Sequence, residues 1–199
     1  MNRLKRILDI IFSMLALIFL FPALIIIGVL LKRDGGPAIF RQERIGREGT
    51  LCWIFKFRSM IVGAEKLGIS VTAENDPRIT HLGRRLRKTK IDELPELFNV
   101  LKGDMSIVGP RPEVAAYVSM WSEDDRKAIL SVRPGITDYA TLFYHDEQAV
   151  LGAADNPAKT YVEQILPQKI RLYRKYLRDC DLGLDLRLIL ATLARMARH

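Results

Sequence analysis

The stretch DELPELFNVLKGDMSIVGPRPE, residues 92–113, carries the clearest local pattern in the chain. Asp92 belongs to the residue types that cap helix N-termini, and apolar side chains follow it at helical spacing. Gly103 supplies a stop signal. The sequence therefore predicts a helix that Asp92 caps and Gly103 ends, followed by a short buried strand at 105–108 and a stiff Gly-Pro-Arg-Pro turn at 109–112.

Two adjacent acidic residues, Asp92 and Glu93, begin this stretch and admit two interpretations. Acidic residues in a first helical turn are favoured by free amide groups and by the helix dipole, which is a purely structural reason for them. Phosphoryl transfer is the other reason, because it needs an aligned nucleophile and cations that screen phosphate oxygens. An aspartate can be that nucleophile and a neighbouring carboxylate can be a base. Both interpretations stay open on these residues alone.

Two carboxylates would repel an anionic diphosphate. The phosphoryl-transfer interpretation therefore implies a divalent cation, Mg²⁺, together with arginines that bind phosphate oxygens. Arg111, braced between prolines, is one candidate.

A long apolar segment, residues 7–31, contains one charged side chain, Asp9. As a helix it would be about 37 Å long, enough to cross a bilayer. Pro22 interrupts it, so we expect a kink there. A helix bent at Pro22 would return both ends to one membrane face, whereas a straight helix would span the membrane, and these two topologies stay open. Basic residues flank both ends, and Asp9 is expected to pair with one in the preceding turn, Lys5 or Arg6.

The rest of the chain shows weaker patterns. After the breaker cluster at 34–37, residues 38–60 predict a β-hairpin with its turn at 46–49. Residues 80–90 predict a short basic helix. Residues 157–199 are helical, and the last part is amphipathic, with an apolar face formed by Leu186, Ile189, Leu190, Leu193 and Met196. Such helices either pack on the domain or lie in the membrane interface.

Composition limits the partners. The 199 residues include 31 Lys and Arg against 23 Asp and Glu, a formal net charge of +8, which favours anionic partners. No nucleic-acid-binding motif is present, so we expect no nucleic acid partner. The two cysteines lack the spacing of a zinc site or a disulfide framework.

Several short motifs, taken in order, resemble the monotopic phosphoglycosyl transferases, a bacterial sugar transferase family that uses undecaprenyl phosphate. They are Lys5-Arg6 with Asp9, the proline-broken helix, KFRSM at 56–60, DELP at 92–95, FNVLKGDMS at 98–106, GPRP at 109–112 and VRPGIT at 132–137.

The resemblance implies roles for individual residues. Asp92 would be the nucleophile that takes the sugar phosphate from a UDP-sugar, releases UMP and forms a covalent aspartyl-phosphosugar intermediate. Glu93 would be the base that helps undecaprenyl phosphate attack this intermediate, and Asp92 would bind Mg²⁺. The residues expected to bind substrate are Arg111, Arg58, Arg87, Arg133, Lys56, Pro110 and Pro112.

The resemblance also implies a fold and a location. We expect an α+β, mainly helical chain, with residues 1–33 as a re-entrant membrane helix. Residues 34–199 would form a small cytosolic, membrane-associated catalytic domain with a short β-hairpin and amphipathic interfacial helices. Its place would be the cytoplasmic face of the bacterial inner membrane, in contact with membrane lipid. There it would initiate polysaccharide biosynthesis, such as capsule or exopolysaccharide, as a monomer or a homodimer. The rival hypothesis is a non-catalytic membrane scaffold that binds polyprenol phosphate or a partner glycosyltransferase.

The chain departs from the family pattern at two places. Phe21 precedes Pro22 where many members have Ser, and residues 138–144, DYATLFY, replace the usual continuation of the VRPGIT motif. The identity of the sugar therefore cannot be transferred from the family. Asp138, Tyr144 or Glu147 either meets the sugar hydroxyls or belongs to a plain surface loop.

Overall fold

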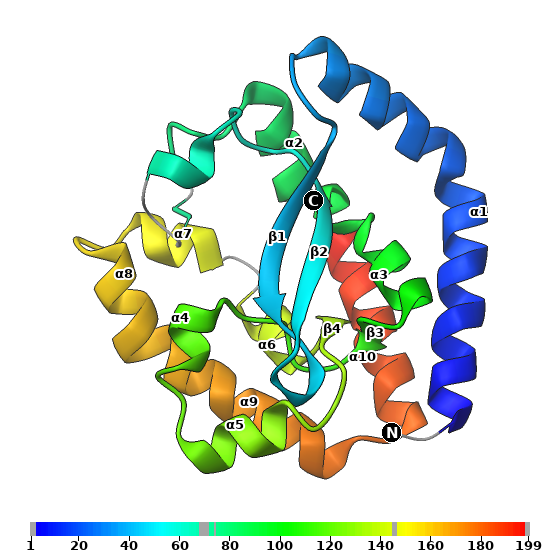
Figure 1. Ribbon diagram of the computed structural model, residues 1–199, viewed down its shortest axis with the longest axis vertical. Helices are drawn as coiled ribbons and strands as arrows, with labels where there is room; N and C mark the ends of the chain where they lie inside the picture. Colours follow the sequence, from blue (N-terminus) through cyan, green and yellow to red (C-terminus); the bar gives the residue numbers. More distant parts are fainter. Residues whose placement is uncertain (1–2, 68–71, 74, 145–146, 198–199) are drawn as a thin grey trace.

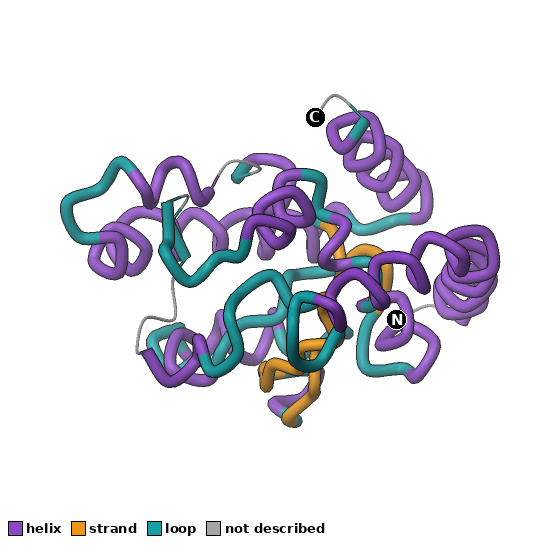
Figure 2. Tube along the Cα trace, turned by 90° about the horizontal axis from the view of Figure 1, so that it is seen from above, coloured by secondary structure: helices purple, strands orange, loops and turns teal. Residues whose placement is uncertain are grey.

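The computed structural model is built mainly of helices, as Figures 1 and 2 show. It describes residues 3–67, 72–73, 75–144 and 147–197. The predicted helical predominance is confirmed. The helices and helical turns are α1 (Arg3–Arg33), η1 (Arg47–Gly49), η2 (Ala64–Leu67), α2 (His81–Lys88), η3 (Ile91–Glu93), α3 (Glu96–Lys102), α4 (Ala115–Val118), α5 (Glu123–Ile129), α6 (Tyr139–Phe143), α7 (Glu147–Gly152), α8 (Pro157–Thr160), η4 (Tyr161–Ile165), α9 (Leu166–Asp179) and α10 (Leu182–Met196).

Two small sheets lie among these helices. β1 (Ile39–Ile45) and β2 (Leu51–Phe57) form the predicted antiparallel hairpin, with Gln42 opposite Ile54. Ile54 is buried against the end of α3 and the start of the next strand. β3 (Ser106–Val108) confirms the strand predicted at 105–108, and it pairs in parallel with β4 (Gly135–Thr137).

The parallel pair brings two motifs together that are distant in sequence. A Cβ atom on Gly135 would lie 2.1 Å from the amide nitrogen of Gly109, so only glycine permits this approach. The GPRP turn and the VRPGIT segment are thereby adjacent. Arg111 uses this closeness, because it donates to the Ile136 carbonyl at 2.8 Å.

Helix α1 continues through Pro22 and bends part-way along its length (Figure 1). Its apolar window has a mean hydropathy of 3.0, and among the described helices it alone is long and apolar enough to cross a membrane. Apolar side chains on its outer face are exposed, such as Ile18 at 67% and Phe19 at 84%. No packing within the described chain accounts for this apolar face.

The N-terminal turns of α1 are fixed to the domain by polar contacts. Lys5 pairs with Asp185 of α10 at 2.5 Å, and Arg6 donates to carbonyls at the end of α3. Asp9 accepts from the Ser106 hydroxyl at 2.7 Å and from the next backbone amide at 3.2 Å. The predicted pairing of Asp9 with Lys5 or Arg6 is therefore wrong. The start of β3 offers Asp9 fixed donors, while both basic residues find acceptors on other elements.

The C-terminal end of α1 is fixed to the same domain. Leu31 is completely buried against Phe57 and Leu86. The Arg58 guanidinium donates to the Leu31 carbonyl at 2.7 Å and to the Pro37 carbonyl at 2.9 Å. Both ends of the apolar helix thus contact one compact unit.

The segment that opens the acidic stretch differs from the prediction. Asp92 does not cap a helix; it lies inside the 3₁₀ turn η3, and α3 begins only at Glu96, after Pro95. Lys90 causes the difference, because its left-handed backbone (φ 57°) reverses the chain just before η3. Gly103, with φ 100°, ends α3 as predicted.

The C-terminal helix α10 forms as predicted, and Ile189 of its predicted apolar face packs on the domain, but the leucines of that face are turned outward. Leu186, Leu190 and Leu193 are 52%, 56% and 55% exposed. Leu188 is the apolar residue buried against the domain, and Asp185, one turn earlier, is buried beside it. The polar contact to Lys5 sets the rotation of this helix.

Candidate functional site

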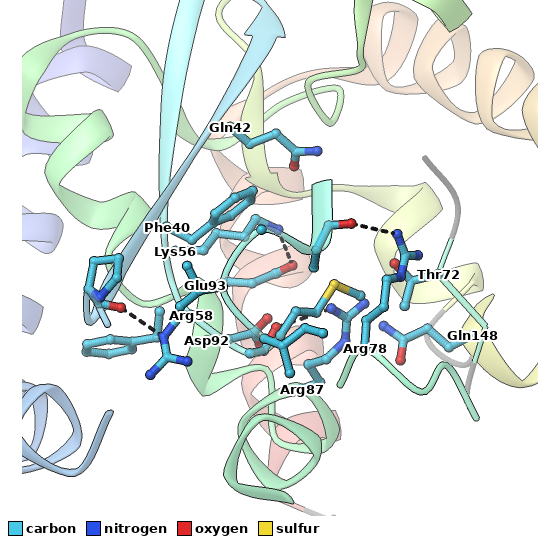
Figure 3. Close-up of a pocket in the computed structure, with 18 of the residues that line it drawn as sticks. Phe40, Gln42, Lys56, Arg58, Thr72, Arg78, Arg87, Asp92, Glu93 and Gln148 are labelled. Atoms are coloured by element: carbon cyan, nitrogen blue, oxygen red, sulfur yellow. Dashed lines mark hydrogen bonds and ion pairs between the residues drawn. The ribbon is translucent and has the colours of Figure 1, made fainter. Parts of the chain in front are cut away.

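The two acidic residues line a cavity of about 400 Å³ (Figure 3). This main cavity lies between the hairpin, α2 and η3. Asp92 and Glu93 come from η3, Lys56 from the end of β2 and Arg87 from the last turn of α2. A smaller recess of about 190 Å³ adjoins it and shares Lys56, Arg87 and Glu93 as walls.

Asp92 is 6% exposed, and its Oδ1 atom is enclosed without a hydrogen-bond partner in the described part of the chain. Burial, followed by the charge of Glu93, raises the pKa of Asp92, while Lys56 and Arg87 act in the opposite direction. An unpaired buried carboxylate is costly unless a ligand or ion completes it. The arrangement therefore suits a group that acts on a bound ligand.

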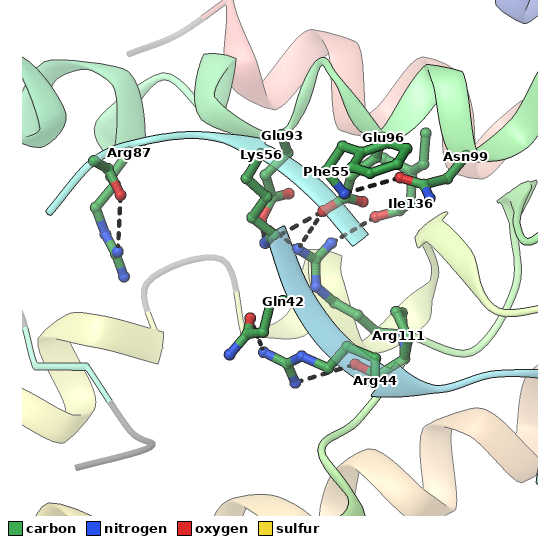
Figure 4. Close-up of polar contacts among 12 residues, drawn as sticks. Gln42, Arg44, Phe55, Lys56, Arg87, Glu93, Glu96, Asn99, Arg111 and Ile136 are labelled. Atoms are coloured by element: carbon green, nitrogen blue, oxygen red, sulfur yellow. Dashed lines mark hydrogen bonds and ion pairs between the residues drawn. The ribbon is translucent and has the colours of Figure 1, made fainter. Parts of the chain in front are cut away.

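Glu93 is engaged by two cations, as Figure 4 shows. Its Oε1 atom accepts from Lys56 Nζ at 2.9 Å and from Arg111 Nη2. Glu96, only 1% exposed, has its Oε1 atom 3.3 Å from Lys56 Nζ and 3.7 Å from Arg111 Nη2. Two carboxylates thus share two cations.

The pKa values of these two carboxyls move in opposite directions. Burial by itself would raise the pKa of Glu93, but the charges of Arg111 and Lys56 outweigh it and lower that pKa. Burial dominates at Glu96 and raises its pKa. Glu93 is therefore a weak proton acceptor as long as both cations hold it, because its ionised form is strongly favoured.

Arg87 and Lys56, two of the residues expected to bind substrate, line both the main cavity and the recess. Arg87 donates to the Ser59 hydroxyl at 3.2 Å. With its amide oriented to satisfy its neighbours, Gln148 accepts from Arg87 Nη2 at 2.7 Å. Lys90 lines both spaces as well. Four cationic side chains of the described residues, Arg44, Lys56, Arg87 and Lys90, therefore line both spaces at their boundary.

Arg58 and Arg133 are placed differently. Arg58 lines the main cavity, but its guanidinium is directed at the Pro37 carbonyl (Figure 3) and at the end of α1. Arg133 is not among the lining residues and donates to the Gly103 carbonyl at 2.7 Å. The structure thus brings Arg111, Arg87 and Lys56 together with the acidic pair and leaves Arg133 apart.

Of the two prolines of the GPRP turn, one lines a cavity and the other does not. Pro112 lines the recess. Pro110 is not a lining residue, and its carbonyl accepts from the Gly135 amide at 3.0 Å. Both therefore hold Arg111 in position through the turn they stiffen.

The divergent segment is a helix and part of the recess, so the plain surface loop is excluded for its described residues. Asp138 is fully buried and caps α6 by accepting from the Thr141 amide at 2.7 Å. Tyr144 and Glu147 line the recess. His145 and Asp146 lie outside the described residues.

A second polar network in the recess was missed by sequence reasoning. The Tyr161 hydroxyl donates to Glu113 Oε1, and Lys169 pairs with Glu147 at 2.6 Å. Tyr161 begins η4, a turn of π-helix of the kind often found at functional sites. No sequence pattern links these distant positions. Glu96 was also missed, although its spacing of three residues from Glu93 was a usable signal.

The residues present could hold a Mg²⁺ ion only together with oxygen ligands supplied by the substrate. Among the described residues, no cluster of three or more His, Cys, Asp or Glu side chains is placed to hold a metal. Mg²⁺ is commonly bound through one or two carboxylates and the substrate's phosphates. The unpartnered oxygen of Asp92 supplies one such carboxylate.

The chain is similar to bacterial transferases over most of its length. The family model described as "Bacterial sugar transferase" matches residues 1–199. An undecaprenyl-phosphate galactose phosphotransferase of Salmonella typhimurium is 41% identical over 169 residues, 72% of this chain and 35% of that protein. A UDP-glucose:undecaprenyl-phosphate glucose-1-phosphate transferase of Escherichia coli is 35% identical over 195 residues, 96% of this chain and 40% of that protein.

A shorter relative shares more of its own length. A putative undecaprenyl-phosphate N-acetylgalactosaminyl 1-phosphate transferase of Bacillus subtilis is 43% identical over 122 residues, 61% of this chain and 68% of that protein. The chain spans about a third of the Salmonella relative and two fifths of the Escherichia coli one. The family match covers the acidic pair, its cationic neighbours and the apolar helix. This chain belongs to the bacterial sugar transferase family.

Proposed function

We propose that the protein is a phosphoglycosyl transferase that moves a sugar 1-phosphate from a UDP-sugar to undecaprenyl phosphate and releases UMP. The observation that carries the proposal is the enclosed, unpartnered oxygen of Asp92 beside Lys56, Arg87 and Lys90. A nucleophile next to several cations is what transfer from a diphosphate needs. The printed names of the relatives, which act on undecaprenyl phosphate, support the same reaction.

In the first half of the reaction, an Asp92 oxygen attacks the phosphorus that bears the sugar. The new oxygen–phosphorus bond forms as the bond to the UMP oxygen breaks, and UMP leaves with that electron pair. Lys56 and Arg87 bind the phosphate oxygens and hold the phosphorus near Asp92. A Mg²⁺ ion held by Asp92 and the diphosphate would supply further charge neutralisation.

In the second half, an oxygen of undecaprenyl phosphate attacks the same phosphorus and displaces Asp92. Glu93 takes a proton from the acceptor phosphate if that phosphate arrives protonated. Phosphate oxygens compete with Glu93 for Lys56 and Arg111, and loss of either cation raises the pKa of Glu93 toward the range of a base. The ion pairs of Glu93 are thus a resting arrangement that substrate binding rearranges.

The placement of α1 supports a re-entrant topology, and we propose that the domain lies on the cytoplasmic face of the inner membrane. Lys5 and Asp9 attach its N-terminal end to the domain, and Leu31 attaches its C-terminal end to the same domain. A helix that spanned the bilayer would place these ends on opposite membrane faces, about 30 Å apart. The exposed leucines of α10 would then lie at the interface.

The test is UMP release by protein in nanodiscs with Mg²⁺, undecaprenyl phosphate and a panel of UDP-sugars. We expect release with at least one donor, and loss of release in Asp92→Asn, which keeps the size of the side chain. Glu93→Gln should still release UMP in a single turnover without the acceptor, because Glu93 acts as a base only in the second half.

A membrane scaffold would bind undecaprenyl phosphate and release no UMP with any donor. Full activity in Asp92→Asn would also refute the assigned nucleophile.

A further inference from the structure

The recess next to the main cavity has its own set of polar side chains. Its walls come from α4, α6, η4 and α9, and they include Tyr117, Thr141, Tyr144, Lys169 and Tyr173. None of these residues lines the main cavity. The recess is thus a separate compartment that opens to the phosphate-binding boundary at Lys56 and Arg87.

The hydroxyl of Tyr173, in the wall of the recess, is fully buried and has no hydrogen-bond partner in the described part of the chain. The Thr141 hydroxyl is enclosed as well and lies against the Asp138 carboxylate, to which it can donate while its oxygen accepts from a ligand. Burial raises the pKa of Tyr173 well above its usual value, so its hydroxyl stays neutral and able to donate. Buried polar groups in native proteins are nearly always paired, because an unpaired one loses its hydrogen bonds to water without replacement.

Tyr176, less than one turn further along α9, shows the ordinary situation. It is buried too, but its hydroxyl donates to Asp185 at 2.8 Å and lies 3.2 Å from the Val108 carbonyl. The same helix therefore satisfies a buried tyrosine on one side and leaves Tyr173 unpaired on the side of the recess. This contrast points to a ligand as the missing partner of Tyr173.

The other walls suit a small molecule rich in hydroxyl groups. Lys169 and Glu147 form an ion pair at 2.6 Å that offers both donors and acceptors. Tyr117 and Tyr161 lie with ring centroids 4.6 Å apart and present aromatic surface. The recess volume of about 190 Å³ is roughly half that of the main cavity, so the larger space suits the nucleotide and the smaller one a single sugar ring.

We propose that the recess binds the pyranose ring of the donor, and that the hydroxyls of Tyr173 and Thr141 form hydrogen bonds with the sugar hydroxyls. This inference rests on the proposed function. A site that hydrogen-bonds a substrate hydroxyl discriminates strongly against an analogue without it, because the protein group is then left unpaired. Tyr173 and Thr141 are accordingly specificity-determining residues.

The matched pair Tyr173→Phe and Tyr176→Phe tests this, since each removes one buried phenolic hydroxyl from α9. The readouts are kcat/KM of UMP release for UDP-glucose, UDP-galactose, their N-acetylated forms and their deoxy analogues, inhibition by UMP, and thermal unfolding. Tyr173→Phe should reduce the preference for the best sugar over its deoxy analogue by about fivefold to tenfold, the value of one hydrogen bond. It should leave UMP inhibition and thermal stability unchanged.

Tyr176→Phe should do the reverse, lowering thermal stability and leaving the sugar preference unchanged. Thr141→Val should also reduce the preference, at another position of the sugar. The proposal is overturned if neither Tyr173→Phe nor Thr141→Val changes the preference. It is also overturned if both weaken UMP inhibition as much as they weaken donor use, because the recess would then hold the nucleotide.

Calorimetric binding of the same UDP-sugars, compared with UDP, separates the two proposals because it needs no turnover. Sugar-dependent affinity that Tyr173→Phe abolishes, without UMP release by the wild type, would refute the transfer reaction and support the recess. UMP release with a sugar preference that both Tyr173→Phe and Thr141→Val leave intact would refute the recess alone.

Discussion

Arg58→Lys separates two roles for an arginine that the sequence assigned to substrate. In the structure the Arg58 side chain is 7% exposed and spans two backbone carbonyls, those of Leu31 and Pro37, with Asp34 3.7 Å away. The Leu31 carbonyl belongs to the last turn of α1, where carbonyls have no partner within the helix. Arg58 supplies that partner and ties the helix to the hairpin.

The size of the effect follows from these contacts. A hydrogen bond from a charged donor contributes about 1.5–3 kcal/mol. Lysine keeps the charge, but its ammonium cannot reproduce the planar fork that reaches both carbonyls, so one of the two bonds is lost. We expect destabilisation of about 2 kcal/mol, which for a chain of this length lowers the Tm by about 4–8 °C.

The assay is thermal unfolding of wild type and Arg58→Lys in the same nanodiscs, together with inhibition of UMP release by UMP. A lower Tm with unchanged UMP inhibition is expected. An unchanged Tm with weakened UMP inhibition would refute the structural role and restore the phosphate contact. Arg41→Lys is the matched control, because Arg41 lies on the same hairpin and its guanidinium contacts the ring of Phe55 instead of backbone carbonyls.

Two further predictions concern the N-terminal contacts and the acidic pair. Asp185→Asn should lower the free energy of unfolding by about 3 kcal/mol, because it breaks a nearly buried pair with Lys5 and leaves that ammonium uncompensated. Denaturant unfolding measures this free energy. A decrease below about 1 kcal/mol, the value of a surface ion pair, would contradict the reasoning. Arg87→Met should move the acid limb of the pH profile of UMP release to higher pH, since the charge of Arg87 lowers the pKa of Asp92 and its removal favours the protonated, non-nucleophilic form. The control Arg87→Lys keeps the charge and should leave the acid limb in place. An acid limb that does not shift in Arg87→Met would argue against Asp92 as the titrating group.

Local patterns sufficed for the elements whose cause is local. The hairpin, the Gly103 stop and the helix over 81–88 follow from turn residues, capping and apolar spacing, and all are present. The cap assigned to Asp92 failed for a local reason that the pattern did not reveal. Lys90 has a left-handed backbone conformation, which is uncommon for residues other than glycine. The sequence therefore does not predict the chain reversal that places Asp92 in the cavity.

The residues of the recess were harder to predict than those around the acidic pair. Lys56, Asp92, Glu93 and Arg111 lie in the short motifs KFRSM, DELP and GPRP, and Arg87 lies in the predicted basic helix, so each could be named before the fold brought them together. The recess depends on contacts across the fold, such as Tyr161 reaching Glu113, whose separation of 48 residues no periodicity encodes. The contacts of Arg58 with backbone carbonyls could not be predicted either, since an arginine that satisfies carbonyls and one that binds phosphate look the same in a sequence.

Arg58 links the wall of the main cavity to the apolar helix α1. Arg58 lines the cavity and holds the last turn of α1 through the Leu31 carbonyl. The first turns of α1 are held by Lys5, whose partner Asp185 lies on α10 beside the exposed leucines. If α1 enters a bilayer as proposed, its two fixed ends set the depth and tilt of the domain. In the proposed reaction a lipid phosphate must reach Asp92, so the contacts at the two ends of α1 would set the position of the acidic pair relative to that substrate.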